Sequence, residues 1–133
     1  MFHEMPVRTR RRSELVDITA DIQAIVERSG VKDGLCHLFV PHTTAAITIN
    51  EKADPDVRRD IGETLSKMVP EGGGYLHAEG NSDAHVKSTL VGVSAFVPVR
   101  DGDIVLGTWQ AVFFCEFDGP RTRSCLVRVM NTG

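Results

Sequence analysis

The segment GLCHLFVPHTTAAITIN, residues 34–50, carries the strongest information about the fold of this chain. Residues 34–41 and 45–50 are apolar or β-branched runs with the length of a strand. Between them, His42-Thr43-Thr44 is polar. We therefore expect two strands that are joined around a polar corner.

Further strands are predicted on both sides of this segment. Five other runs have strand composition: 2–10, 91–99, 103–106, 109–117 and 123–129. The turns at 100–103 and 118–120 are rich in Asp, Gly and Pro, which is typical of hairpins between antiparallel strands. The basic run Arg10-Arg11-Arg12 is expected in a solvated turn or at a strand edge.

Three helices are predicted between these strands. The first is an amphipathic helix that ends at Gly30, which supplies a left-handed stop. The second begins at Asp54-Pro55, with Asp as the cap and Pro at the first helical position, and ends before Pro70. A short third helix covers 82–90. The expected fold class is α+β, a mainly antiparallel β-sandwich-like sheet with about three helices packed outside.

Length and composition exclude several classes of protein. The 133 residues predict a single domain over 1–133, and 41% hydrophobic residues predict a packed core. A net charge of -3 argues against binding to nucleic acid or anionic lipid. No apolar run approaches the about 20 residues of a membrane span, so we expect a cytoplasmic protein. Cys36, Cys115 and Cys125 lie in apolar strands and are interpreted as core.

Histidines give the clearest functional signal, because four of the five fall in two neighbourhoods. His42 follows a strand end, whereas His77 and His85 flank the start of the third helix. Neutral imidazole is the commonest zinc ligand, so these three side chains are candidates to hold a divalent metal, Zn²⁺ or Mg²⁺. Their spacing differs from the HExxH motif. His37 lies inside an apolar strand and is interpreted as structural.

The segment 77–85 also suits an anionic ligand. A helix start lies between its two histidines, and the N–H groups of a helix N-terminus bind phosphate or carboxylate. Other polar side chains that can complete a pocket are Thr43, Thr44, Asn50, Glu51, Glu79 and Asn81.

The turn after Asp118 adds two arginines. Arg121 and Arg123 are two residues apart, so a strand would send both to one face, where they could bind a phosphate bidentately. Surface salt bridges are the alternative interpretation. The single tryptophan, Trp109, is expected in the core, and Gln110 is a candidate for a polar contact.

Four motifs follow one another along the chain: PHTTAAITINEKADPDVRRD (41–60), YLHAEGNSDAH (75–85), GTWQ (107–110) and DGPRTR (118–123). Together they resemble the YjbQ family of small bacterial and archaeal proteins over nearly the whole chain. The resemblance implies a β-sandwich-like core and a homotrimer with a polar pocket near the subunit boundaries. It also implies a secondary thiamine-phosphate synthase activity, which joins a pyrimidine pyrophosphate to a thiazole phosphate.

The resemblance further implies which residues form the site. They are His42, Thr43, Thr44, Asn50, Glu51, His77, Glu79, Asn81 and His85, with Gln110, Arg121 and Arg123 as outer members. In this hypothesis His42, His77 and His85 hold a metal or the substrate phosphate. Glu51, Glu79 and His77 are the catalytic candidates, with a carboxylate as the proton acceptor.

Two functions of different classes fit these residues. The first is an enzyme that acts on small phosphorylated molecules, and the second is a non-catalytic protein that binds a metal or an anionic metabolite in the same pocket. A purely structural scaffold is less favoured, because polar side chains are dense in two short motifs. The sequence has no Ser–His–Asp order, no phosphate-binding glycine loop and no dinucleotide fingerprint. The familiar schemes of nucleophilic catalysis and nucleotide binding therefore lack support.

Overall fold

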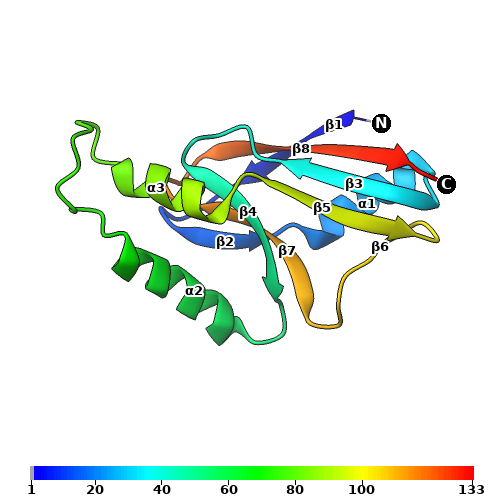
Figure 1. Ribbon diagram of the computed structural model, residues 1–133, viewed down its shortest axis with the longest axis horizontal. Coiled ribbons are helices and arrows are strands. Elements are labelled where there is room, and N and C mark those ends of the chain that lie inside the picture. Colours follow the sequence, from blue (N-terminus) through cyan, green and yellow to red (C-terminus); the bar gives the residue numbers. More distant parts are fainter. Residues whose placement is uncertain (1) are drawn as a thin grey trace.

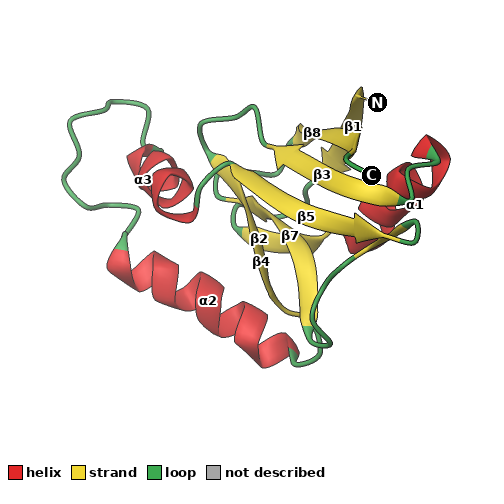
Figure 2. Cartoon of the chain, turned by 45° about the vertical axis from the view of Figure 1, so that its right-hand side comes forward, coloured by secondary structure: helices red, strands yellow, loops and turns green. Residues whose placement is uncertain are grey.

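Strands from both halves of the chain form two sheets, and helices lie outside them (Figures 1 and 2). The computed structural model describes residues 2–133, and within this range it contains eight strands and three helices. They are β1 (Phe2–Arg8), β2 (Glu14–Asp17), α1 (Thr19–Ser29), β3 (Asp33–Phe39), β4 (Ala45–Glu51), α2 (Pro55–Met68), α3 (Ser82–Val91), β5 (Ser94–Arg100), β6 (Asp103–Ile104), β7 (Gln110–Glu116) and β8 (Thr122–Asn131). The α+β class is confirmed.

The larger sheet has the strand order β1-β8-β3-β5-β6 and the smaller one β2-β7-β4, with antiparallel pairing throughout. The two strands of segment 34–50 therefore belong to different sheets, and the corner at 42–44 carries the chain between them. The hairpin expected at 100–103 is confirmed by β5 and β6. The one expected at 118–120 is wrong, because that turn crosses from β7 to β8 in the other sheet.

The main core lies between the two sheets and α1. Alternate residues of β3 face it, so Cys36 and Leu38 are fully buried and His37 lies on the outer face, as expected. All three cysteines are buried thiols. Burial raises the pKa of Cys36 to about 11 and the pKa of Cys115 and Cys125 to about 12, which fits inert core side chains.

β7 is buried on both faces. Val112 and Phe114 face the main core, whereas Phe113 and Cys115 face a second cluster that includes side chains of α2 and α3. A strand covered on both sides has a continuous apolar sequence rather than an alternating one. Trp109 precedes this strand in a turn and is 62% exposed. Its predicted place in the core is therefore wrong, because the two apolar clusters that cover the faces of β7 do not extend to residue 109.

The helix boundaries follow local signals. α1 ends at Gly30, which has a φ of +73°. α2 begins after Asp54, whose carboxylate accepts the Asp56 N–H at 2.9 Å. α3 begins at Ser82, within the segment that carries two of the histidines. None of the helices described over 2–133 has the length and apolar character needed to cross a membrane.

Candidate functional site

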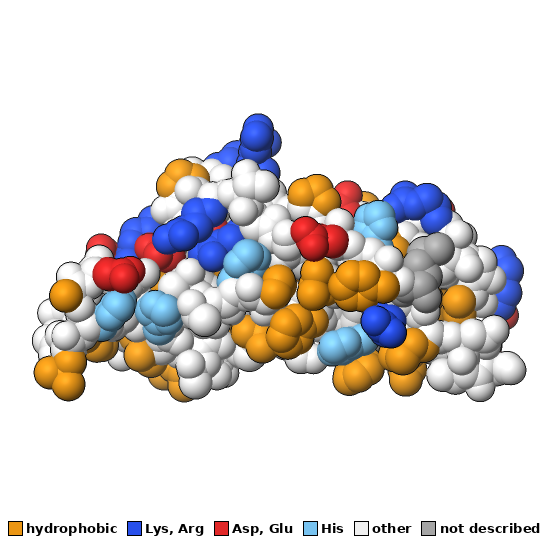
Figure 3. All heavy atoms as spheres, turned by 90° about the horizontal axis from the view of Figure 1, so that it is seen from above, with side chains coloured by type: hydrophobic (Ala, Val, Ile, Leu, Met, Phe, Trp, Pro, Cys, Tyr) orange, Lys and Arg blue, Asp and Glu red, His pale blue; other side chains and the backbone are white. Residues whose placement is uncertain are grey.

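Polar side chains gather at one end of the sandwich, where β1 and β7 end and where β4, α3 and β8 begin. Figure 3 shows histidine, acidic and basic side chains close together at this end, on the left of that view. We call it the polar end and define it by residues 9–12, 42–44, 77–88 and 116–124. The loops that connect the two sheets meet here, so segments far apart in the sequence become neighbours.

A buried ion pair between Glu116 and Arg123 forms the centre of the polar end. Arg123 Nε donates to Glu116 Oε1 at 2.9 Å, Nη2 donates to Oε2, and the side chains are 0% and 4% exposed. Thr9 Oγ1 donates to Glu116 Oε1 at 2.7 Å, and Arg123 Nη2 donates to Thr44 Oγ1 at 2.8 Å. Burial alone would raise the pKa of Glu116, but hydrogen bonds, above all those from Arg123, hold it below the ordinary value. Thr44 and Arg123 thus belong to a closed, internally satisfied network.

A second buried carboxylate, Asp83, ties α3 to the rest of the protein. Arg12 donates to both Asp83 oxygens at 3.1 Å, and Lys87 Nζ lies 3.5 Å from Asp83 Oδ2. Burial opposes the charge on Asp83, yet the bonds with Arg12 keep its pKa below the ordinary value. Residues 10–12 lie in an irregular segment just before β2, and Arg12 is only partly solvated because the carboxylate of Asp83, 71 residues later, binds its guanidinium.

Asn81, Asp118 and Arg121 form a third polar group. Asn81 Nδ2 donates to Asp118 Oδ2 at 2.9 Å, and Arg121 Nη2 donates to the same oxygen at 2.8 Å. Asn81 Oδ1 is buried and has no hydrogen-bond partner. Arg121 is about half exposed while Arg123 is buried, so the two arginines do not form the pair on one face that was predicted. β8 begins only at Thr122, and Arg121 still lies in the turn.

His77 and Glu79, with the partly exposed His85 beside them, form the exposed part of the polar end. His77 Nε2 lies 3.7 Å from Glu79 Oε2, and the two imidazole rings meet edge to face with their centroids 5.5 Å apart. The side chains of His77 and Glu79 are 43% and 74% exposed. These three groups, unlike the buried carboxylates and arginines, are open to a ligand from solvent.

His42 lies at the same end but is already engaged. Its Nε2 accepts the Ser124 N–H at 3.0 Å. Burial lowers the pKa of His42, and the positive charge of Arg123 lowers it further. Over the described residues, no three His, Cys, Asp or Glu side chains are grouped so that they could hold a metal ion. Of the three histidines predicted to hold a metal, only His77 and His85 are in contact. The metal therefore stays a prediction.

Asn50, Glu51 and Gln110 lie at the opposite end of β4. Glu51 pairs with Gln110 in the ladder, and the seven-residue strand spans about 20 Å from Ala45. Their side-chain oxygens accept nearby backbone N–H groups, such as that of Ala53 for Glu51. Within one chain, then, Glu51 does not reach the histidines, and the predicted residues fall into two groups.

Sequence reasoning missed the partners that complete the polar end, which are Arg12, Lys87 and Glu116. Two of them left a signal. Glu116 interrupts the apolar run AVFFCEF at 111–117, and Lys87 follows Asp83 by four residues, the spacing of an ion pair along a helix. Nothing local distinguishes Arg12 from its two basic neighbours.

Comparison with known proteins places the chain among proteins of matching length. The family model for "UPF0047 protein YjbQ-like" matches residues 3–132. The UPF0047 protein of Methanocaldococcus jannaschii is 51% identical over 130 residues, 98% of this chain and 94% of that protein. The UPF0047 protein YugU of Bacillus subtilis is 45% identical over 98% of this chain and 99% of its own length.

Solved structures agree in fold. An uncharacterised YjbQ/UPF0047 protein of Clostridium acetobutylicum has a TM-score of 0.94 at 48% identity, covering 96% of this chain and 99% of that one. A protein of unknown function from Sulfolobus solfataricus has a TM-score of 0.94 at 39% identity, covering 98% and 96%. These descriptions name a family but no activity, so thiamine-phosphate synthesis stays a prediction.

Proposed function

The chain belongs to the UPF0047, YjbQ-like family, and we propose that its polar end binds and transforms a small phosphorylated molecule. One observation carries the proposal. Asn81 Oδ1 is buried without a hydrogen-bond partner at the start of α3, close in the chain to the exposed imidazole of His77 and the partly exposed imidazole of His85. A hydroxyl or amino group of a ligand would satisfy this oxygen, whose present state costs free energy.

The start of α3 offers a place for the phosphate. Within residues 2–133, Asn81 makes no side-chain cap bond, and of the first helical N–H groups only that of Ala84 has a side-chain acceptor, the carboxylate of Asp83. These groups and the positive end of the helix dipole favour an anion. His85 lies in the first turn of the same helix and can donate to the same phosphate.

The reaction that the family resemblance implies is the coupling of a thiazole phosphate to a pyrimidine pyrophosphate. The thiazole nitrogen forms a bond to the carbon that carries the pyrophosphate, and the C–O bond breaks with its electron pair leaving on pyrophosphate. In this step His77 would donate a hydrogen bond to the departing oxygen, and Glu79, whose Oε2 lies 3.7 Å from His77 Nε2, would orient the imidazole. Arg121, exposed at the same end, would add positive charge.

Variants of the exposed loop test this proposal. His77→Ala and Glu79→Ala are assayed for binding of the thiazole phosphate by calorimetry and for formation of thiamine phosphate by chromatography. We expect turnover to fall about 100-fold or more with binding largely retained. His3→Ala, in β1, is the matched histidine control and should behave as the parent. A parent protein without turnover would overturn the enzymatic proposal.

A non-catalytic binding protein is the second candidate. It is favoured by the internal pairing of Glu116, Asp83 and Asp118, which leaves few groups free for chemistry. In the same experiment, this function predicts phosphate binding that His77→Ala weakens, with no product from the parent protein.

A divalent metal would have His77 and His85 as its protein ligands. Two imidazoles are fewer than the three or four protein ligands of a usual zinc site, so oxygens of a bound phosphate would have to complete the shell. Such an ion would neutralise charge on the leaving group. Elemental analysis of untagged protein, before and after addition of Zn²⁺, Mn²⁺ or Mg²⁺, tests this. Absence of stoichiometric metal under all conditions would refute it.

The homotrimer implied by the resemblance is also proposed, and the outer face of the larger sheet supports it. Phe2, Phe39 and Phe96 are 55%, 38% and 57% exposed there, and His37 stacks on Phe96 with centroids 4.5 Å apart. Apolar side chains exposed side by side on one sheet face favour association. Light scattering measures the mass of the assembly, and a monomer at micromolar concentration would contradict the proposal.

An oligomer also offers a way to join the two groups of site residues. If Glu51 of one subunit completes the polar end of another, Glu51→Gln and His77→Ala are each inactive alone. In trimers assembled at random from an equal mixture of the two variants, a shared site is intact only when one subunit supplies Glu51 and its neighbour supplies His77. About a quarter of the parental sites would then be restored. Recovery of no activity after co-refolding would place Glu51 outside the catalytic group.

A further inference from the structure

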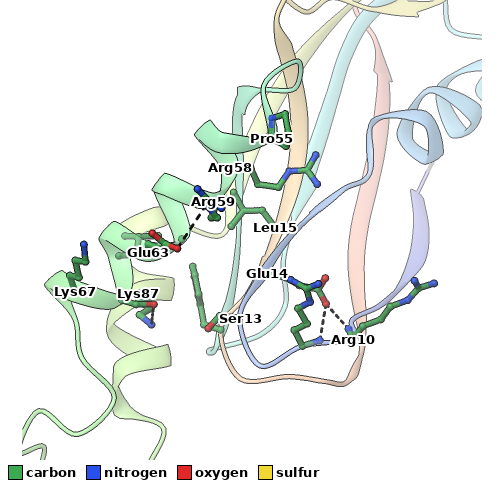
Figure 4. A pocket seen from close by; sticks show the side chains of 15 residues that line it. Arg10, Ser13, Glu14, Leu15, Pro55, Arg58, Arg59, Glu63, Lys67 and Lys87 are labelled. Carbon is green, nitrogen blue, oxygen red and sulfur yellow. Dashed lines mark hydrogen bonds and ion pairs between the residues drawn. The ribbon is translucent and has the colours of Figure 1, made fainter.

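A cavity of about 840 Å³ lies between α2 and the segment 10–15, with Lys87 of α3 at one end (Figure 4). It exists because α2 packs only loosely on the smaller sheet, with Ile61 and Leu65 partly buried against the second cluster. That helix has no buried residue, whereas α1 buries three of its apolar residues against the main core. Leu15, Leu65 and Phe117 give the cavity apolar walls.

The charged lining of the cavity is strongly basic. Its basic residues are Arg10, Arg11, Arg58, Arg59, Lys67 and Lys87, and its acidic ones are Glu14 and Glu63. Both carboxylates are engaged, because Glu14 accepts the backbone N–H groups of Arg10 and Arg11, and Glu63 lies 3.9 Å from Arg59. The excess of positive charge favours an anionic occupant.

Lys87 is a buried cation with unused hydrogen-bonding capacity. Its side chain is 3% exposed, and Nζ lies 3.5 Å from both Ser66 Oγ and Asp83 Oδ2, at the limit of hydrogen-bond length. An ammonium group has three donors. Two donors are used at this limiting length and Nζ also lies 5.9 Å from the centroid of the Phe117 ring, so one donor of this cavity-lining residue has no hydrogen-bond acceptor among the described residues.

Arg58 supplies a second unsatisfied donor. Its Nε is buried and has no hydrogen-bond partner, and its guanidinium lies over the ring of Phe113 at 4.6 Å. A buried charged donor without an acceptor costs free energy, which an anionic oxygen would recover. Figure 4 shows Arg58 and Lys87 in different parts of the same cavity.

We propose that this cavity is a binding site for a small molecule that combines an aromatic or aliphatic body with a phosphate or carboxylate group. The body would lie on Leu15, Leu65 and Phe117, and the anion would take hydrogen bonds from Lys87 or Arg58. The volume is that of a typical small-molecule site. This site is additional to the exposed loop 77–81 and does not depend on the function proposed for it.

Titration with simple probes tests the proposal. Phenyl phosphate and benzoate share an aromatic ring and differ in the anionic group. Two half-probes serve as comparison: inorganic phosphate lacks the aromatic ring, and benzyl alcohol lacks the anionic group. We expect saturable binding of phenyl phosphate or benzoate by calorimetry, about tenfold or more tighter than either half-probe. The better of the two aromatic anions identifies the preferred acid group. Failure of both to bind would overturn the proposal.

Variants locate the bound probe. Arg58→Met keeps the contact with Phe113 and removes its donor, and Lys87→Met removes the other candidate donor. Replacing the residue that holds the anion should weaken binding about tenfold or more, and binding unchanged in both variants would overturn the proposal. Arg28→Gln, in the last turn of α1, is the matched control and should bind as the parent. His77→Ala separates the two sites. If it abolishes probe binding while Arg58→Met and Lys87→Met have no effect, the anion binds at the exposed loop 77–81 and the cavity proposal is wrong.

Discussion

The buried and exposed parts of the polar end satisfy their charges in different ways. In the buried part, Glu116 is held by Arg123 and Asp83 by a bidentate arginine, with every carboxylate oxygen bonded. In the exposed part, His77 and Glu79 are 3.7 Å apart, largely in water, and form no hydrogen bond with each other.

This difference separates stability from ligand binding. A buried charge that loses its partner is left uncompensated in a medium of low dielectric constant, so the buried residues are constrained by folding. Exposed charges gain little from each other and can change partner at small cost. The loop 77–81 is therefore available to a ligand, while the network behind it holds the loop in place.

Breaking the central ion pair should have the largest effect. Arg123→Met leaves Glu116 buried without its counter-charge, which we expect to lower the free energy of unfolding by about 3–5 kcal/mol. Urea unfolding followed by circular dichroism measures this. The double variant Glu116→Leu/Arg123→Met contains no unpaired charge and should recover most of the loss. A double variant as unstable as the single one would contradict the assignment.

Neutralising the second carboxylate should have a smaller effect. Asp83→Asn removes the charge that holds Arg12 and Lys87, and we expect a loss of about 2–3 kcal/mol, because Arg12 is a third exposed and can return to water. Asp56→Asn, an exposed acid of α2, is the matched control. Equal stability of the two variants in urea would show that Asp83 does not anchor α3.

Acid should weaken the buried part in two stages. His42 has a pKa lowered chiefly by burial, so the unfolded state binds more protons and stability starts to fall below about pH 6.5. Glu116 and Asp83 have lowered pKa values, so their contribution is complete above the ordinary carboxyl range. It is lost as the pH falls through the lowered values, below about pH 4.

Urea unfolding between pH 7 and pH 3 measures both stages. The double variant Glu116→Leu/Arg123→Met lacks one of the two carboxylates and should show a shallower loss in the acidic stage. A slope identical to that of the parent below pH 4 would show that Glu116 is not a source of the acid sensitivity.

Changes in the exposed loop should barely alter stability. We expect His77→Ala to shift the free energy of unfolding by less than about 0.5 kcal/mol, because the side chain is exposed and its contact with Glu79 is weak. The same variant is expected to lose turnover. A loss of stability above 1 kcal/mol would place His77 with the buried network instead.

Features that depend on local signals were predictable. Asp54-Pro55 and Gly30 mark helix ends through the conformations they favour, and the apolar runs at 34–41 and 45–50 correspond to β3 and β4. Trp109 was misplaced, because composition alone does not show where the layers that cover β7 end.

The candidate site likewise has a part that was predictable from the sequence and a part that was not. The group in 77–85 was predictable because its members are close in the chain. The separation of Glu51 from these histidines was not, since it depends on which end of β4 meets α3. The engagement of Arg123 with Glu116 likewise depends on how β7 and β8 cross between sheets.

The sequence by itself determined the α+β class, the helix ends, the strand runs other than β2 and the histidine-containing segment 77–85, because periodicity and capping act over a few residues. Only the tertiary structure decided which charges are buried together and which remain open to a ligand. Thr9 and Glu116 are 107 residues apart, and Arg12 and Asp83 are 71 apart. Such pairs follow from how the loops between two sheets converge, and no local pattern encodes that.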